Sequence, residues 1–347
     1  NPYPPSPKVL AALNDFSGEL LRRYPDPLAQ DFCQVGGETF GMPADWVIAG
    51  NGSDDLLTLI VRACAQGHER PLAYPMPTYV LYRTLAAIQP AQTVEIDYEN
   101  REGDNWQLPV EKLLAADAAV TFVATPNSPS GHLVPIADLR KLAQGLSGVL
   151  VIDEAYVDFV GEGADVASLA LVREFDNVMV LRTLSKGYAL AGLRLGFGFA
   201  QPALLKGLFK VKDSYNVDAI ALKLAAVAIA DQGYKRAIAQ KVIAAREQLA
   251  QDLQVLGFRV WPSQTNFLLV QPPGEKVVGD GTLDEPNLEN GARIAQRLYK
   301  GLKAKQIMIR YFDQPGLANK LRLTVGTPEQ NRQLVCGLKM LLTAMPN

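Results

Sequence analysis

Short apolar runs recur along the first part of the chain and alternate with stretches that carry apolar residues at helical spacing. These runs are predicted to form strands at 46–49, 71–73, 118–124, 149–152 and 178–181. Helices are predicted between some of these strands: one after the turn at 50–55, one at 79–87 and one at 135–144. The first of them gathers one apolar face from Leu56, Leu57, Ile60, Val61 and Cys64. Strands that alternate with helices predict an α/β fold on a mostly parallel, doubly wound sheet.

The pattern changes towards both ends of the chain. Four prolines among the first seven residues predict an extended arm, and residues 9–23 are predicted to form a helix that ends at Tyr24-Pro25-Asp26-Pro27. An alanine-rich helical region from 219 to 256, broken at Gln232-Gly233, leads into a second set of strands and helices. That set predicts strands at 259–261, 266–270, 307–310 and 320–325, and helices at 292–304 and 329–342.

A chain of 347 residues is long enough for two domains. We expect an N-terminal arm and helix at 1–28 that pack on the small domain, a large domain at 29–240, and a small α+β C-terminal domain at 241–347. The segment 271–291 is rich in glycine, proline and acidic residues and is expected to be a surface insertion.

Composition narrows the function classes. With 48% hydrophobic and 20% charged residues the chain is globular, and its net charge of -2 without a basic block disfavours nucleic acid or an anionic membrane as partner. Three scattered cysteines and two histidines give no metal-ligand spacing, so no metal is expected. The free thiols and the absence of an apolar run long enough for a bilayer predict a cytoplasmic protein.

The stretch 181–200 carries the most specific combination of reactive residues. Lys186 comes where a predicted strand ends, with the hydroxyls of Thr183 and Ser185 before it and Arg194 eight positions after it. Such an amine can condense with an aldehyde cofactor, while the hydroxyls and the guanidinium bind that cofactor's phosphate. Alone, a Ser-Lys pair is more typical of an exposed loop, so the interpretation depends on the rest of the chain.

A glycine turn at 50–55 joins a predicted strand to the start of a helix, where bare backbone N–H groups can bind an anion. Gly52 lets a ligand approach the main chain, and Ser53 is predicted to cap the helix or to bind a phosphate. The acidic Asp54 complements the helix dipole. The turn matches neither a Walker A loop nor a dinucleotide fingerprint, which disfavours ATP and NAD.

Further candidate residues follow other strands. Asp153 ends an apolar strand, where a buried carboxylate needs a cationic partner such as a protonated pyridine nitrogen, or else an arginine or a backbone cap. Tyr79 can stack on a planar ring or belong to the core. On its strand Arg322 points away from its leucine neighbours and, like Arg310, can clamp a carboxylate or be an ordinary surface arginine.

Six motifs in this order and spacing resemble the fold-type I, class I and II, pyridoxal-phosphate aminotransferases: GNGSDD, YPMPTY, PNSPSG, VIDEAYVDF, LRTLSKGYALAGLRLGF and LRLTVGT. The resemblance runs almost end to end, and within the family it is closest to the histidinol-phosphate aminotransferases. It implies transamination between glutamate and imidazole-acetol phosphate in histidine biosynthesis, pyridoxal 5'-phosphate as cofactor, and a homodimer.

The resemblance also implies a role for each candidate residue. Lys186 would attach the cofactor covalently and move the proton at the substrate Cα, and Asp153 would pair with the ring nitrogen. Arg322 would bind the substrate α-carboxylate or its equivalent, and Arg310 the phosphate of histidinol phosphate. The remaining cofactor contacts are implied for Tyr156 and Asn127 at the ring 3-oxygen, Tyr79 on the ring face, Gly52, Ser53, Asp54, Thr183, Ser185 and Arg194 at the phosphate, and Tyr24 at the phosphate of the neighbouring subunit.

The loop Asn127-Ser128-Pro129-Ser130-Gly131 departs from the family's common NNPTG, so the ring-oxygen contact falls to Asn127, to Ser128 or to water. Two alternatives share the fold: a threonine-phosphate decarboxylase-like enzyme and an aromatic amino acid aminotransferase. A non-catalytic cofactor-binding module is an alternative of another class, which retention of both Lys186 and Asp153 disfavours.

Overall fold

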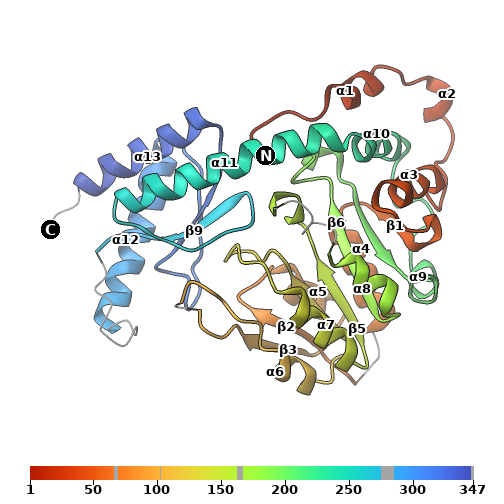
Figure 1. The fold of residues 1–347 in the computed structure, drawn as a ribbon, viewed down its shortest axis with the longest axis horizontal. Coiled ribbons are helices and arrows are strands. Elements are labelled where there is room, and N and C mark those ends of the chain that lie inside the picture. Colours follow the sequence, from red (N-terminus) through yellow and green to blue (C-terminus); the bar gives the residue numbers. More distant parts are fainter. Residues whose placement is uncertain (66–68, 102, 162–166, 275–284, 345–347) are drawn as a thin grey trace.

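The computed structural model describes residues 1–65, 69–101, 103–161, 167–274 and 285–344. Within them, one large mixed sheet has the strand order β1-β7-β6-β5-β4-β2-β3 (Figure 1). Its strands are β1 (Val47–Gly50), β2 (Leu72–Met76), β3 (Thr93–Asp97), β4 (Val120–Ala124), β5 (Val149–Asp153), β6 (Val178–Thr183) and β7 (Gly196–Ala200). The strand β7 runs antiparallel to both of its neighbours, β1 and β6, and the other neighbouring pairs are parallel. The predicted α/β class with a mostly parallel sheet is confirmed.

Helices cover both faces of this sheet. Successive side chains along each strand point to opposite faces, so each central strand contributes to two apolar clusters. In β5, Leu150 and Ile152 join the apolar cluster on one face and Val151 joins the cluster on the other. The first face is covered by α3 (Gln30–Phe40), α7 (Ile136–Gly145), α8 (Leu169–Glu174) and α10 (Ala219–Ala230). The second is covered by α4 (Ser53–Cys64), α5 (Leu81–Ile88) and α9 (Pro202–Phe209). The short α6 (Val110–Ala115) packs beside α7.

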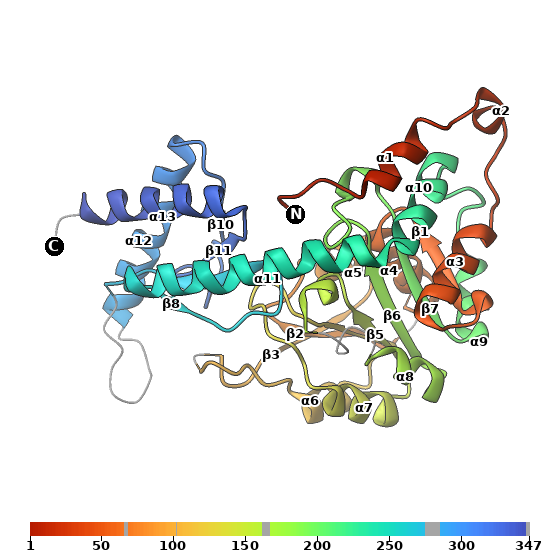
Figure 2. The same cartoon turned by 45° about the horizontal axis from the view of Figure 1, so that its top comes forward.

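A second, antiparallel sheet forms the other end of the molecule. Its order is β10-β11-β9-β8, from β8 (Arg259–Val260), β9 (Phe267–Gln271), β10 (Arg310–Tyr311) and β11 (Leu321–Thr324). It shares an apolar cluster with α11 (Gln232–Val255), α12 (Glu285–Ala304) and α13 (Pro328–Thr343). The long α11 runs from α10 to the small sheet (Figure 2). The predicted domain boundary after residue 240 falls inside α11 and stays a prediction.

The N-terminal helix was predicted wrongly. Instead of one helix over 9–23 there are two short ones, α1 (Pro7–Leu13) and α2 (Gly18–Leu21). Asn14 closes the first of them, and the polar residues that follow, together with Gly18, have low helix propensity, so the helix is not continued. The elements α3, α6, α8, α9 and β3 were not predicted. On the edge strand β3 the side chains of Thr93, Glu95 and Asp97 are exposed, which makes its alternation weakly hydrophobic.

Two expected absences concern only the described residues. Among them, no helix is long and apolar enough to cross a bilayer, and no group of histidine, cysteine and acidic side chains is arranged to hold a metal ion. Of the surface insertion predicted at 271–291, residues 275–284 lie outside the described residues, while Gln271 ends β9 and 285–291 begin α12 instead of continuing the insertion.

Candidate active site

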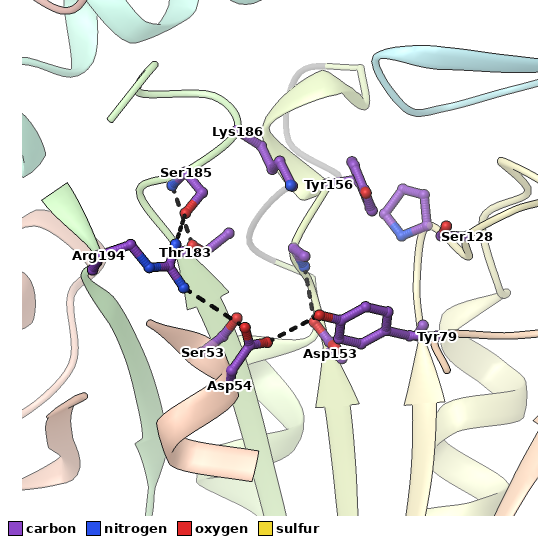
Figure 3. Close-up of a pocket in the computed structure, with 13 residues that line it drawn as sticks. Ser53, Asp54, Tyr79, Ser128, Asp153, Tyr156, Thr183, Ser185, Lys186 and Arg194 are labelled. Atoms are coloured by element: carbon purple, nitrogen blue, oxygen red, sulfur yellow. Dashed lines mark hydrogen bonds and ion pairs between the residues drawn. The ribbon is translucent and has the colours of Figure 1, made fainter. Parts of the chain in front are cut away.

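A pocket opens at the C-terminal ends of β4, β5 and β6, where most of the predicted site residues meet (Figure 3). These strands are neighbours in the parallel part of the sheet, so residues that follow them along the chain converge at one edge. The lining residues are Ser53, Asp54, Tyr79, Ala124, Pro126, Ser128, Asp153, Ala155, Tyr156, Thr183, Ser185, Lys186 and Arg194. Residues more than 130 positions apart in the chain therefore share one pocket.

Lys186 follows β6 in a turn and extends its amine into the pocket (Figure 3). Its Nζ lies 5.6 Å from the centre of the Tyr156 ring. Burial lowers the pKa of Lys186, and the nearby guanidinium groups of Arg322 and Arg194 lower it further. The side chain of Asn1 donates to the backbone carbonyl of Lys186 at 2.9 Å, so the N-terminal arm holds the turn that carries the amine. A lysine in these surroundings gives up its proton more readily than one in water.

Asp153 ends β5 on the floor of the pocket, and its side chain is buried. Its Oδ1 accepts from the backbone N–H of Ala155 at 3.2 Å, and its Oδ2 accepts from the hydroxyl of Tyr82 at 2.8 Å. Burial raises the pKa of Asp153, because the charged form loses its hydration. A carboxylate held this way is stabilised by a cation in the pocket, and a protonated ring nitrogen is such a cation.

The opposite end of the pocket is suited to a phosphate. Gly52, with φ +84°, caps α4, so the first turn presents backbone N–H groups of Ser53 and Asp54 without helical acceptors. The prediction that Ser53 itself caps the helix is wrong: Ser53 is its first residue and its side chain makes no capping bond. Arg194 completes the site. Its Nη1 donates to the Ser185 hydroxyl at 3.5 Å, and its Nη2 lies 3.6 Å from Asp54 Oδ2.

Gly196 of β7 is packed against this anion-binding turn. A Cβ at this position would lie 2.1 Å from the backbone nitrogen of Ser53. We expect Gly196→Ala to push the first turn of α4 out of place and to weaken binding of pyridoxal phosphate at least about tenfold. The measurement is the dissociation constant of pyridoxal phosphate for the apoprotein. Gly192→Ala is the matched control, because a Cβ there meets nothing within 4 Å; equal weakening in both variants would contradict the assignment.

Of the two candidate residues in the loop after β4, Ser128 lines the pocket and Asn127 does not. Asn127 is fully buried, and its amide is already engaged: Oδ1 accepts from Thr78 at 3.0 Å, and Nδ2 donates to the Pro77 carbonyl at 3.1 Å and to the Ser130 hydroxyl at 2.9 Å. The geometry therefore favours Ser128 for contact with a ligand, and the contact with Asn127 stays a prediction that this arrangement does not support.

Tyr79 and Tyr156 form the aromatic walls of the pocket. The hydroxyl of Tyr79 donates to Asp54 Oδ1 at 3.2 Å (Figure 3), and burial raises its pKa to about 12. Burial also raises the pKa of Tyr156. Both phenols are therefore protonated at neutral pH and can donate hydrogen bonds.

The small sheet contributes Arg322, whose Nη1 donates to the Ser128 hydroxyl at 2.9 Å. Its Nε is buried and has no hydrogen-bond partner among the described residues. Arg310 lies directly opposite Arg322 on the adjacent strand, so the two cations share a face. Burial and the nearby Arg310 lower the pKa of Arg322. Two adjacent guanidinium groups with an unsatisfied N–H are suited to an anionic ligand.

Tyr24 lies away from the pocket and is not among the residues that line it. Its side chain is 80% exposed and stacks on Tyr215 with ring centres 4.5 Å apart. Within a single chain it therefore contacts no candidate ligand site.

Two residues that the sequence did not single out belong to the site. Ser128 was considered only as an alternative, and Tyr82 was not considered, although it contacts Asp153 directly. Tyr82 lies within the helix predicted at 79–87, where its hydroxyl is no different in pattern from that of a core tyrosine.

Comparisons with known proteins agree with this geometry. The sequence model of the family described as aminotransferase class I and II matches residues 1–338 of this chain. Histidinol-phosphate aminotransferase 1 of Trichormus variabilis is 58% identical over 99% of this chain and 90% of its own length, and the protein of the same name from Nostoc sp. is 56% identical over 99% and 89%.

Among solved structures, histidinol-phosphate aminotransferase from Sinorhizobium meliloti, in complex with pyridoxal-5'-phosphate, superposes with a TM-score of 0.87 and 25% identity over 100% of this chain and 89% of that one. Pocket, sheet order and comparisons lead to one conclusion: this chain belongs to the class I and II aminotransferase family and has its fold-type I architecture.

Proposed function

We propose that this pyridoxal-phosphate-dependent transaminase is a histidinol-phosphate aminotransferase, which exchanges an amino group between glutamate and imidazole-acetol phosphate. The observation that carries the proposal is one pocket that joins Lys186, Asp153 and the first turn of α4, in a chain 58% identical to a relative of that name. The cofactor, the transaminase class and the family are those of these relatives.

The pocket offers a suitable group for each part of the pyridoxal phosphate molecule. Lys186 supplies a primary amine for the aldehyde, and Asp153 a buried carboxylate for the ring nitrogen. The N-terminus of α4 with Arg194 provides N–H donors and positive charge for the phosphate. Tyr79 offers an aromatic face for the ring. When bound, the cofactor supplies an electrophilic aldehyde and a ring that acts as an electron sink for the substrate Cα.

The side chains of this protein divide the remaining work. Lys186, with its lowered pKa, holds the cofactor and then accepts and returns the proton at the substrate Cα. Asp153 keeps positive charge on the ring nitrogen by pairing with it. Tyr156 and Ser128 lie on the wall where the ring 3-oxygen is expected, and both carry hydroxyls that can bind it.

Arg322 and Arg310 are proposed to bind the two ends of the substrates. Arg322 reaches the pocket wall through Ser128 and is placed to bind an α-carboxylate or the group in its position. Arg310, beside it on β10, would bind the phosphate of histidinol phosphate and the distal carboxylate of glutamate.

We propose that the protein is a cytoplasmic homodimer. Tyr24 is exposed and lies away from the pocket of its own chain, and the neighbouring Leu20, Leu21 and Leu28 are also exposed. Covering this surface with a second copy would bury apolar area, and it would let Tyr24 reach the cofactor phosphate of the partner subunit.

Turnover of competing substrates tests the substrate assignment. Histidinol phosphate is expected to be the best amino donor, ahead of threonine phosphate and phenylalanine. If phenylalanine were the better donor, the aromatic aminotransferase alternative would replace this proposal, and release of carbon dioxide from threonine phosphate would favour the decarboxylase. A protein that binds pyridoxal phosphate and transfers no amino group would be the non-catalytic module.

Arg310→Ala is expected to reduce the preference for histidinol phosphate over unphosphorylated histidinol about tenfold, because a charge-assisted hydrogen bond to the phosphate is lost. The measurement is kcat/KM for the two donors in wild type and variant. Arg332→Ala removes an exposed arginine of α13 that pairs with Glu329 and should leave the preference unchanged. An unchanged preference in Arg310→Ala would exclude Arg310 from phosphate binding.

A further inference from the structure

A fully buried tyrosine of α5 contacts the carboxylate on the pocket floor from outside the pocket. The hydroxyl of Tyr82 donates to Asp153 Oδ2 at 2.8 Å, and no part of the Tyr82 side chain is exposed. Tyr82 does not line the pocket, so it acts on a ligand only through Asp153 and through the residues that its ring touches.

The ring of Tyr82 packs against three other aromatic rings. It stacks on Phe122 of β4 with ring centres 4.7 Å apart and planes 9° from parallel. It also contacts Tyr79 edge-to-face, at 5.9 Å and 86°, and Tyr74 in a tilted arrangement at 5.8 Å. One side chain thus supports both the aromatic wall and the acidic floor of the pocket, and its close packing leaves its hydroxyl one direction in which to donate.

A structural role alone does not account for this hydroxyl. Tyr82 belongs to the apolar cluster under the second face of the sheet, where a phenylalanine would fill the same space. Burying a hydroxyl is unfavourable unless it is hydrogen-bonded, and the bond here goes to a residue of the pocket. The hydroxyl is therefore best explained by what it does to Asp153.

The two donors to Asp153 fix the plane of its carboxylate. The N–H of Ala155 binds Oδ1 and Tyr82 binds Oδ2, which leaves the free lone pairs directed at the pocket that Asp153 lines. Burial raises the pKa of Asp153; Tyr82, Ala155 and the Lys186 ammonium act in the opposite direction, and the Asp54 carboxylate adds to the rise.

We propose that Tyr82 is a positioning residue for the cofactor, which keeps the Asp153 carboxylate ionised and aimed at the ring nitrogen while its ring supports Tyr79. The proposal rests on the proposed function for the cofactor and its orientation, and on no particular substrate.

Tyr82→Phe tests the proposal, with Tyr74→Phe as matched control. Tyr74 is a buried tyrosine of the same cluster, with its ring 5.8 Å from that of Tyr82, and its hydroxyl donates to Glu95 at 2.7 Å rather than to a pocket residue. Both variants lose one buried hydroxyl bonded to a carboxylate. Three quantities are measured in each: the dissociation constant of pyridoxal phosphate, the pH dependence of the visible spectrum of the holoenzyme, and kcat.

Tyr82→Phe is expected to weaken cofactor binding and to lower kcat, each about tenfold, because a hydrogen bond to a charged group is lost. Without the donor the pKa of Asp153 rises further, so the acidic limb of the spectral titration moves to higher pH. Tyr74→Phe should show none of these changes.

If both variants behave alike in binding, titration and kcat, the positioning role is wrong. Failure of the wild type to use histidinol phosphate would overturn the proposed substrate and would leave the cofactor titration, which needs no substrate, as the test of Tyr82.

Discussion

Lys186→Ala is expected to abolish transamination, with a fall in kcat of about 10⁴-fold or more, on the scale seen when a nucleophile is removed. The variant should also lose the visible absorption band of a lysine-bound cofactor. Both effects follow from geometry, because Lys186 is the one lysine that lines the pocket in the described part of the chain. The measurements are single-turnover kinetics and an absorption spectrum of the protein with added pyridoxal phosphate.

The remaining pocket should still bind the cofactor in this variant. The first turn of α4, Arg194 and Asp153 are unchanged, so pyridoxal phosphate is expected to bind reversibly and to be lost on dialysis. The wild type should retain it. Loss of covalent attachment with retained reversible binding separates the role of Lys186 from a general collapse of the site.

Lys212→Ala is the control for a lysine in similar electrostatic surroundings. Burial also lowers the pKa of Lys212, but its Nζ donates to the Asp213 carbonyl outside the pocket. Its substitution should leave kcat and the spectrum within about twofold of wild type, as expected for a residue remote from the chemistry. A Lys186→Ala protein that retained the visible band or substantial turnover would refute the assignment of the amine.

The location of the site could be predicted from the sequence because it depends on a simple property of parallel sheets. Asp153 and Lys186 each follow an apolar run, and strands of this kind end at the same edge. The glycine turn before α4 was recognisable for a similar reason, since a strand that leads directly into a helix exposes N–H groups. These parts of the site need only the order of elements and the nature of a residue at each strand end.

The parts that could not be predicted depend on contacts between distant residues. Asn127 and Ser128 are adjacent, and the one that faces the pocket is decided by the hydrogen bonds that Thr78, Pro77 and Ser130 make with Asn127. The contact of Tyr82 with Asp153 spans 71 positions in the chain. Neither contact leaves a periodic signal, because hydrogen bonds between side chains of different elements do not affect the hydrophobic pattern.

Neighbouring acids at the end of β5 have opposite roles, which gives a second prediction with a large effect. Asp153 faces the pocket, whereas Glu154 is buried against Arg182, with Oε2 2.8 Å from Nη2, and against the Ser168 hydroxyl. Asp153→Asn should therefore impair catalysis and spare the fold. Glu154→Gln should do the reverse, because it removes the carboxylate that forms a buried ion pair with Arg182.

For Asp153→Asn we expect kcat to fall about 10²- to 10³-fold, since the ring nitrogen loses the charge that stabilises its proton in a site with little water. The amide has the same shape: its oxygen can accept from the Ala155 N–H and its NH₂ can donate to the Tyr82 oxygen. Burial raises the pKa of Asp153 in the folded protein above its pKa in the unfolded chain. Ionisation of Asp153 therefore lowers the stability of the fold as the pH rises above the pKa of an ordinary aspartate. The apoprotein of Asp153→Asn should therefore melt at the same temperature as wild type or higher.

Glu154→Gln is expected to lose about 3–5 kcal/mol of stability while the folded protein keeps a kcat within a fewfold of wild type. Thermal unfolding of both apoproteins and kcat of both holoenzymes give the four values needed. If Asp153→Asn lowered the melting temperature as much as Glu154→Gln and the two fell equally in kcat, Asp153 would be a structural acid like its neighbour. A buried carboxylate that serves the cofactor makes the fold less stable but the enzyme more active. Its substitution by an amide is therefore expected to lower kcat without lowering stability.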